Sequence, residues 1–139
     1  MAIWIILALV LTLFLFGAYR KYALIKNHNP ANESAEIKTL TDGNFKQTIS
    51  KGTVLVDFWA PWCSPCLMLA PTISALADEF KEKAIIGKLN IDEQKKIATE
   101  FGIRSIPTVV LFKNGKPVEK FVGIKSQSTY SKAINNNLA

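Results

Sequence analysis

The chain has 139 residues, which suits one ordinary domain with a short extension, and its formal charge is +6. Lys and Arg total 17 against 11 for Asp and Glu. This balance is too mild to indicate nucleic-acid binding, and no basic block or basic-aromatic alternation supports such binding. Two cysteines are too few for a disulfide-dense scaffold, and a single histidine nearly excludes a four-ligand zinc site. The composition excludes collagen-like, disordered and coiled-coil classes.

The N-terminal segment predicts a membrane helix. Residues 2–19 are almost wholly apolar, with Thr12 as the one clearly polar interior residue. As a helix this run is about 27 Å long, close to the hydrocarbon thickness of a bilayer. Trp4 and Tyr19 lie near its ends, where amphipathic rings favour the interface. A buried core helix would show one polar face, and this run shows none. Residues 1–20 are therefore assigned as a transmembrane anchor or signal segment.

A retained anchor is favoured over a cleaved signal peptide, because no basic side chain precedes the run and Phe16-Gly17-Ala18 is a poor cleavage site. Arg20, Lys21 and Lys26 follow the run, so the positive-inside rule predicts a cytoplasmic domain. The alternatives are a periplasmic or other extracytoplasmic domain, and a secreted domain released by signal cleavage. Residues 21–35 are polar and predict a tether.

From residue 36 onward, strand-like and helix-like patterns alternate in the order βαβαβαββα. This order predicts an α/β domain at 36–139, with a central mixed β-sheet and helices on both faces. The predicted strands lie at 37–40, 53–59, 84–91, 108–112 and 118–122, with a hairpin turn at Asn114-Gly115. The predicted helices run from a cap at Thr41-Asp42 to about Ser50, from a turn at Ala60-Pro61 to about Lys83, from a cap at Asp92 to Glu100, and from a cap at Ser126 onward.

The segment that carries chemistry is 57–71, DFWAPWCSPCLMLAP. Cys63 and Cys66 are separated by two residues, directly after a buried strand and at the start of a helix. This spacing lets the sulfurs bond with little loop closure. It also leaves Cys63 at a helix N-terminus, where free N–H groups and the helix dipole stabilise a thiolate. A thiolate is the attacking species in disulfide exchange, and Cys66, one turn deeper, is suited to resolve a mixed disulfide.

Three other interpretations of this pair compete with redox chemistry. The pair could be two of the four ligands of a zinc site, but the other ligands are lacking. The chain has no other cysteine, and its one histidine, His28, lies in the tether. A static structural disulfide would constrain little of the unfolded chain across a four-residue loop. Plain core cysteines are disfavoured because the strand-to-helix context argues for an exposed Cys63. Redox chemistry is therefore the favoured interpretation.

Several segments, in the right order, resemble the thioredoxin family, and the resemblance covers the chain from about Ile37 to the C-terminus. The matching segments are Val56-Asp57-Phe58-Trp59-Ala60, Trp62-Cys63-Ser64-Pro65-Cys66, Lys88-Leu89-Asn90-Ile91-Asp92, Gly102-Ile103-Arg104, Ile106-Pro107-Thr108 and Phe112-Lys113-Asn114-Gly115. The resemblance implies the thioredoxin fold, a reversible Cys63–Cys66 disulfide, Cys63 as nucleophile and Cys66 as resolving thiol. The membrane segment and the tether lie outside it.

The resemblance also implies a proton-exchange group. Asp57 would be a buried carboxylate that exchanges a proton with Cys66, and Lys88 would lie near it. Burial raises a carboxyl pKa and makes such a group a usable base near neutral pH. The alternatives are a strand-end capping role for Asp57 and a solvated strand-edge charge for Lys88.

The implied substrate-binding residues are Trp62, Ser64, Pro65, Ile106, Pro107 and Gly123. Pro107 resembles the cis-proline that faces the cysteines, and the backbone of Ile106 would hydrogen-bond an extended substrate strand. Gly123 resembles the glycine that keeps this surface flat. Two departures stand out: Ser64 replaces the usual glycine of CGPC, and Leu67 replaces a usual basic residue. The reduction potential and the choice of partner are therefore expected to differ from those of a general soluble thioredoxin.

The sequence thus predicts a membrane-tethered protein-disulfide reductase that acts on disulfide-bearing proteins. It needs no metal and no cofactor beyond its own disulfide. Because no flavin or nicotinamide motif is present, the electrons must come from a separate protein, either a thioredoxin reductase or a membrane electron relay. The alternatives are an oxidase, isomerase or cytochrome-maturation enzyme outside the cytoplasm, and a non-catalytic docking module.

Overall fold

The computed structural model describes residues 2–26 and 33–138, which fold as two compact units, the second beginning at Glu33. Residues 27–32 of the predicted tether, His28 among them, lie outside the described residues.

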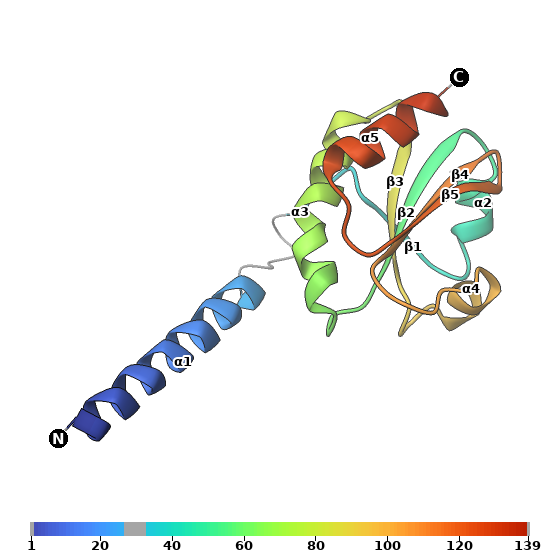
Figure 1. The fold of residues 1–139 in the computed structure, drawn as a ribbon. Coiled ribbons are helices and arrows are strands. Elements are labelled where there is room, and N and C mark those ends of the chain that lie inside the picture. Colours follow the sequence, from blue (N-terminus) through green and yellow to red (C-terminus); the bar gives the residue numbers. More distant parts are fainter. Residues whose placement is uncertain (1, 27–32, 139) are drawn as a thin grey trace. The chain divides into compact units, whose positions relative to one another are not determined.

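The first unit is one helix, α1 (Ala2–Lys26), drawn in blue in Figure 1. Among the described residues, α1 is the one helix long and apolar enough to cross a membrane. Its window Ile3–Arg20 has a mean hydropathy of 2.1, and none of that window is buried. The helix continues beyond Tyr19 into residues predicted as tether, because no glycine or proline interrupts 18–26.

The second unit is built on five strands and four helices. The strands are β1 (Lys38–Leu40), β2 (Thr53–Trp59), β3 (Ile85–Asn90), β4 (Thr108–Lys113) and β5 (Lys116–Val122). The helices are α2 (Phe45–Ile49), α3 (Ser64–Glu79), α4 (Lys95–Glu100) and α5 (Gln127–Asn136). The sheet order is β1-β3-β2-β4-β5, with β1, β3 and β2 parallel and with β4 antiparallel to both β2 and β5. The predicted element order and mixed sheet are confirmed.

Helices cover both faces of this sheet, as predicted. Figure 1 shows α3 and α5 together on one face, and α2 and α4 on the other. Two apolar cores result. The core under α3 and α5 includes Leu55, Ile73 and Tyr130, and the core under α2 and α4 includes Phe45 and Phe58.

Strand β2 lies at the centre and leads directly to the cysteines. It pairs with β3 on one side and β4 on the other, and its residues 53–58 are all buried. This burial on both faces explains its run of β-branched and aromatic residues. Asp57 is the one ionisable residue of the strand, and it shares a face with Leu55 because side chains alternate along a strand.

Neither aspartate of the two predicted helix caps, Asp42 and Asp92, caps the helix that follows it, because each carboxylate accepts a hydrogen bond from another segment. Asn44 directly precedes α2 but makes no side-chain cap bond. The Thr41 hydroxyl instead accepts the Asn44 N–H at 3.3 Å, and the Thr41 carbonyl accepts the Phe45 N–H at 3.0 Å, so the Thr41 part of the predicted cap is confirmed. The Asp42 carboxylate instead accepts the backbone N–H of Ile97 in α4 at 3.0 Å. The helix predicted from Asp92 begins only at Lys95, with Gln94 before it.

The other helix and turn signals differ less from the structure. Helix α3 ends at Glu79 rather than near Lys83, because the chain turns at Glu82, whose φ is 67°. The Ser126 cap of α5 is confirmed, since its side chain accepts the Thr129 N–H at 3.3 Å. The hairpin at Asn114-Gly115 is confirmed as well, with φ values of 48° and 84° that suit this turn.

Candidate active site

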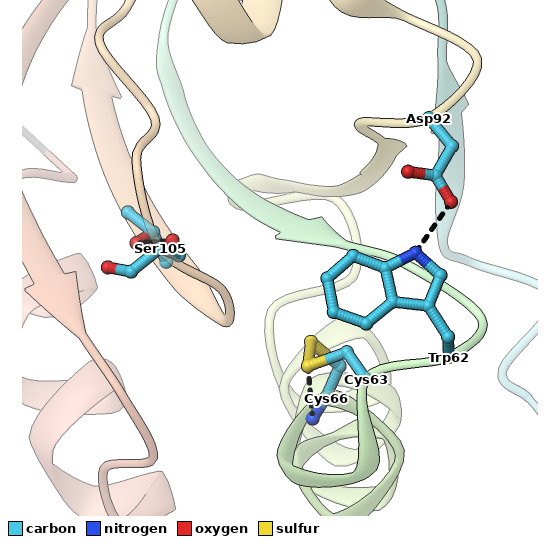
Figure 2. The surroundings of a disulfide bond; sticks show 6 residues. Trp62, Cys63, Cys66, Asp92 and Ser105 are labelled. Atoms are coloured by element: carbon cyan, nitrogen blue, oxygen red, sulfur yellow. Dashed lines mark hydrogen bonds between the residues drawn. A yellow bond between two sulfur atoms is a disulfide. The ribbon is translucent and has the colours of Figure 1, made fainter.

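The two cysteines lie where the central strand meets the longest helix of the second unit. Cys63 follows β2 by four residues and is the N-cap of α3, with its N–H donated to the Ala60 carbonyl at 3.1 Å. Cys63 and Cys66 form a disulfide, with their Cα atoms 5.2 Å apart. Figure 2 shows this disulfide at the start of the helix. The buried end of β2 thus fixes the position at which α3 begins.

The backbone around Cys63 favours negative charge on its sulfur. The Cys66 N–H donates to the Cys63 Sγ at 3.3 Å, so the sulfur already serves as the cap of the first helical turn. A thiolate at this position accepts that bond more strongly and gains from the helix dipole. The geometry therefore favours the thiolate form of Cys63 once the disulfide is reduced.

Both cysteines are buried in the disulfide form, with Cys63 4% and Cys66 2% exposed. The side chains packed against the pair are those of Trp59, Ala60, Ile91 and Ile106. The prediction that Cys63 is exposed is therefore wrong for this form, because residues from neighbouring segments cover the sulfur. The sequence could not show this cover, since it depends in part on Ile91 and Ile106, which are distant from the cysteines along the chain.

Trp62 lies beside the disulfide and faces solvent, with 69% of its surface exposed. Its indole Nε1–H donates to Asp92 Oδ2 at 2.9 Å, as Figure 2 shows. This bond fixes one edge of the ring and explains why Asp92 does not cap α4. The aspartate was missed as a site residue, because its place before a helix predicted a cap.

The loop before β4 forms the side of the site that packs against the cysteines. The Ile106–Pro107 peptide bond is cis, Ile106 packs against the cysteines, and Pro107 is buried. Gly123, with a φ of 78°, donates its N–H to the Pro107 carbonyl at 2.9 Å. The positive φ favours glycine at this position. The structure thus brings together the loop residues and glycine that the resemblance singled out.

The first turn of α3 is open on its outer side. Ser64 and Pro65 are exposed, Leu67 is half-buried, and Met68 is 66% exposed. Val122 and Ile124, on either side of Gly123, are also exposed apolar residues. The segments that carry the site therefore present more apolar than charged side chains.

Asp57 lies beneath the site and is almost completely buried, at 1% exposure. Neither carboxylate oxygen has a hydrogen-bond partner within the described residues. Burial, the largest effect, raises its pKa from 3.8 to about 7, while the Lys88 charge lowers the pKa and the Glu33 charge raises it. The capping alternative is wrong, since Asp57 makes no such bond, and the group can both hold and release a proton near neutral pH.

Lys88 is the β3 residue paired with Asp57 across the sheet. Its side chain is only 7% exposed, with the ammonium 4.3 Å from the centre of the Trp59 ring and ion-paired with Glu33. The strand-edge alternative is wrong, because β3 lies between β1 and β2. Glu33 was missed, because nothing in a polar tether marks one glutamate as a partner of a buried lysine.

Within residues 2–26 and 33–138, no group of three or more His, Cys, Asp or Glu side chains is placed to hold a metal ion. The chemistry that the described residues support is thiol–disulfide exchange at Cys63 and Cys66.

Comparisons with known proteins agree with this geometry. A family model described as Thioredoxin matches residues 36–136. A thioredoxin from Chlorobaculum thiosulfatiphilum is 50% identical over 100 residues, covering 70% of this chain and 93% of the relative. A thioredoxin from Staphylococcus haemolyticus is 43% identical over 102 residues, covering 73% and 98%. The solved structure of a mutant thioredoxin from Halobacterium salinarum superposes with a TM-score of 0.69 at 31% identity, covering 78% of this chain and 96% of that one.

These relatives are matched over nearly their whole length, and the match includes the segment that carries the cysteines. Family membership implies disulfide-bearing protein substrates and a separate protein that reduces the domain again. The chain therefore belongs to the thioredoxin family and is a protein-disulfide oxidoreductase with a redox-active disulfide.

Proposed function

We propose that this chain is a membrane-tethered protein-disulfide reductase whose second unit lies in the cytoplasm. The tethering is supported by the apolar, unburied window Ile3–Arg20 and by the aromatic residues near its ends, Trp4 and Tyr19. The orientation is supported by Arg20, Lys21 and Lys26, which follow the apolar run while no basic side chain precedes it.

Cys63 is proposed as the nucleophile. The observation that carries this role is its place as the α3 N-cap, with the Cys66 N–H donated to its sulfur. In the reduced protein, the Cys63 thiolate attacks one sulfur of a substrate disulfide. A mixed disulfide forms, and the second substrate sulfur leaves as a thiolate that takes a proton.

Cys66 is proposed to complete the reaction. Its thiol gives a proton to the Asp57 carboxylate, and the resulting thiolate attacks the Cys63 sulfur. The Cys63–Cys66 disulfide forms as the remaining substrate sulfur leaves. Two electrons pass to the substrate, which gains two thiols, and the domain ends oxidised. Because the pKa of Asp57 is about 7, its carboxyl can both accept a proton from Cys66 and return it near neutral pH.

An extended stretch of substrate is proposed to lie along the loop before β4. The backbone of Ile106 next to the cis-Pro107 would pair with it, and Trp62 and Gly123 would border it. Ser64 and Pro65 would contact it from α3. Leu67, in place of a basic residue, favours apolar over acidic substrate surfaces.

The thiol mechanism is tested by insulin reduction with the full chain in detergent micelles. Cys63→Ser is expected to abolish turnover, because the remaining thiol, Cys66, is buried and has no second thiol with which to release a substrate. Cys66→Ser is expected to stop at a covalent adduct that forms through Cys63. Ser50→Ala, at the exposed C-cap of α2 and three residues before β2 begins, is the control and is expected to leave turnover unchanged. Full activity in either cysteine variant would reject the mechanism.

The membrane orientation is tested with reporters fused after Ala139. A reporter that works only in the cytoplasm is expected to be active, and one that works only outside is expected to be silent. A thioredoxin reductase is then the expected electron source. The reverse result would contradict the orientation and favour a membrane electron relay, with an oxidase, isomerase or cytochrome-maturation role.

A further inference from the structure

Glu33 reaches the redox site from outside the segment that matches the thioredoxin family. The family match begins at residue 36, and Glu33 comes three residues earlier. The next residue holds this stretch against α3: the Ser34 N–H donates to Ser74 Oγ at 3.2 Å, and the Ser34 hydroxyl donates to Asp78. The end of the tether is thus fixed to the oxidoreductase domain, and this places Glu33 within reach of β3.

Glu33 and Asp57 are both close enough to Lys88 to be affected by its charge. Lys88 pairs with Asp57 across the sheet, and its charge acts on the Asp57 carboxyl. Its ammonium nevertheless donates to Glu33, and Asp57 has no hydrogen-bond partner among the described residues. The Lys88 side chain is 7% exposed, so water screens these charges weakly.

We propose that Glu33 is a positioning residue that holds the Lys88 ammonium and so preserves the ability of Asp57 to exchange a proton with Cys66. This inference rests on the proposed role of Asp57. It adds to that role a residue of the tether, which acts through Lys88 and through its own negative charge rather than by contact with the reacting sulfurs.

The charges around Asp57 support this assignment. Lys88 on β3 lowers the Asp57 pKa, and Glu33 raises it. Tyr130 on α5 is a phenol and carries no charge near neutrality, and burial raises the pKa of its hydroxyl further. The α3 cysteines do not titrate while they are joined, and the β4 partner Val109 is apolar. Glu33 is therefore the one described negative charge that offsets Lys88 at this carboxyl.

The consequence for catalysis follows from the sign of each effect. Without the Glu33 charge, Lys88 would stabilise the Asp57 carboxylate more strongly, and the pKa of Asp57 would fall. A carboxylate of lower pKa is a weaker base toward Cys66. Near neutral pH it also carries less often the proton that it must return when the disulfide is reduced again. Glu33 thus lets the Asp57 carboxyl act as a base when the substrate is reduced and as an acid when the Cys63–Cys66 disulfide is reduced again.

The direct test is an NMR titration of the Asp57 carboxyl in the oxidised full chain in detergent micelles. Glu33→Gln removes the charge while keeping the size of the side chain, and it is expected to lower the Asp57 pKa. Glu36→Gln is the matched control, because Glu36 lies in the same stretch but pairs with the exposed Lys81 at 2.7 Å. It is expected to leave the titration unchanged.

The second readout is the pH profile of insulin reduction, with each rate at pH 6 divided by the same variant's rate at pH 8. In Glu33→Gln this ratio is expected to rise roughly two- to threefold, since more Asp57 is ionised at pH 6. Lys88→Gln is expected to shift the profile the opposite way. A loss of structure would lower both rates and leave the ratio in place.

An Asp57 titration that is the same in Glu33→Gln and in the wild type would overturn the inference. If the wild type also reduces insulin, the proposed function survives that result. If the wild type does not reduce insulin, the proposed function fails, and the titration still decides whether Glu33 acts on Asp57.

Discussion

Helices α1 and α3 are both rich in apolar residues, yet they place those residues in opposite surroundings. In α3 the apolar residues form a stripe against the sheet, and Leu69, Ile73 and Leu76 are completely buried. In α1 the apolar side chains lie all round the helix and are exposed, with Leu11 at 58% and Phe14 at 73%. A stripe can be covered by the rest of a domain, whereas an apolar surface on every side needs an apolar surrounding.

The two regions also treat polar groups differently. In α1 the Thr12 hydroxyl donates to the Leu9 carbonyl of its own helix at 2.9 Å. Such a bond satisfies a hydroxyl without any partner from outside the helix. In the interior under α3, Asp57 is buried with neither oxygen bonded to any described residue. An orphaned ionisable group in a core is costly, so it marks a functional site rather than a stabilising one.

The largest effect expected from this difference is on the pH dependence of stability. The Asp57 pKa is about 7 in the folded protein against 3.8 in the unfolded chain. Folding therefore binds this proton more tightly, and stability is lost as pH rises from about 4 through about 7. Asp57→Asn cannot ionise, and it is expected to be more stable than the wild type by about 4 kcal/mol at pH 8 and nearly equal to it at pH 4.

Urea unfolding of the full chain in detergent micelles, followed by tryptophan fluorescence from pH 4 to 8, measures this. Asp92→Asn makes the same chemical change at an exposed carboxylate and serves as the control. It is expected to keep the wild-type slope of stability against pH. If Asp57→Asn kept that slope too, Asp57 would not cause the pH dependence of stability. The contrast between the unbonded Asp57 carboxyl and the bonded Thr12 hydroxyl in α1 would then have no measurable consequence.

Local patterns predicted most of this molecule. The strand 53–59 and the cysteine spacing indicated the order of elements and the position of the disulfide, because both depend on neighbours in the sequence. What was missed depends on contacts between distant segments. Asp92 lies 30 residues from Trp62 and Glu33 lies 55 from Lys88, and neither pairing leaves a periodic signal. The cover over Cys63 was missed for the same reason.

A smaller effect on stability is expected when the same leucine-to-alanine change is made in each of the two helices. Leu76 of α3 is completely buried, so Leu76→Ala removes packed methyl groups, leaves a cavity and is expected to cost the domain about 3 kcal/mol. Leu11→Ala makes the same change on the exposed surface of α1, and it is expected to alter the free energy of unfolding of the domain by less than about 0.5 kcal/mol.

Urea unfolding at pH 5 of both variants, again in micelles, gives the comparison directly. The pH is chosen because less of Asp57 is ionised there, and packing then dominates the difference. Equal losses in the two variants would mean that the side chains of α1 contribute to the folded domain as those of α3 do. The distinction between a helix covered by its own chain and a helix that needs another surrounding would then fail. A loss confined to Leu76→Ala would instead show that the oxidoreductase domain carries its own stability.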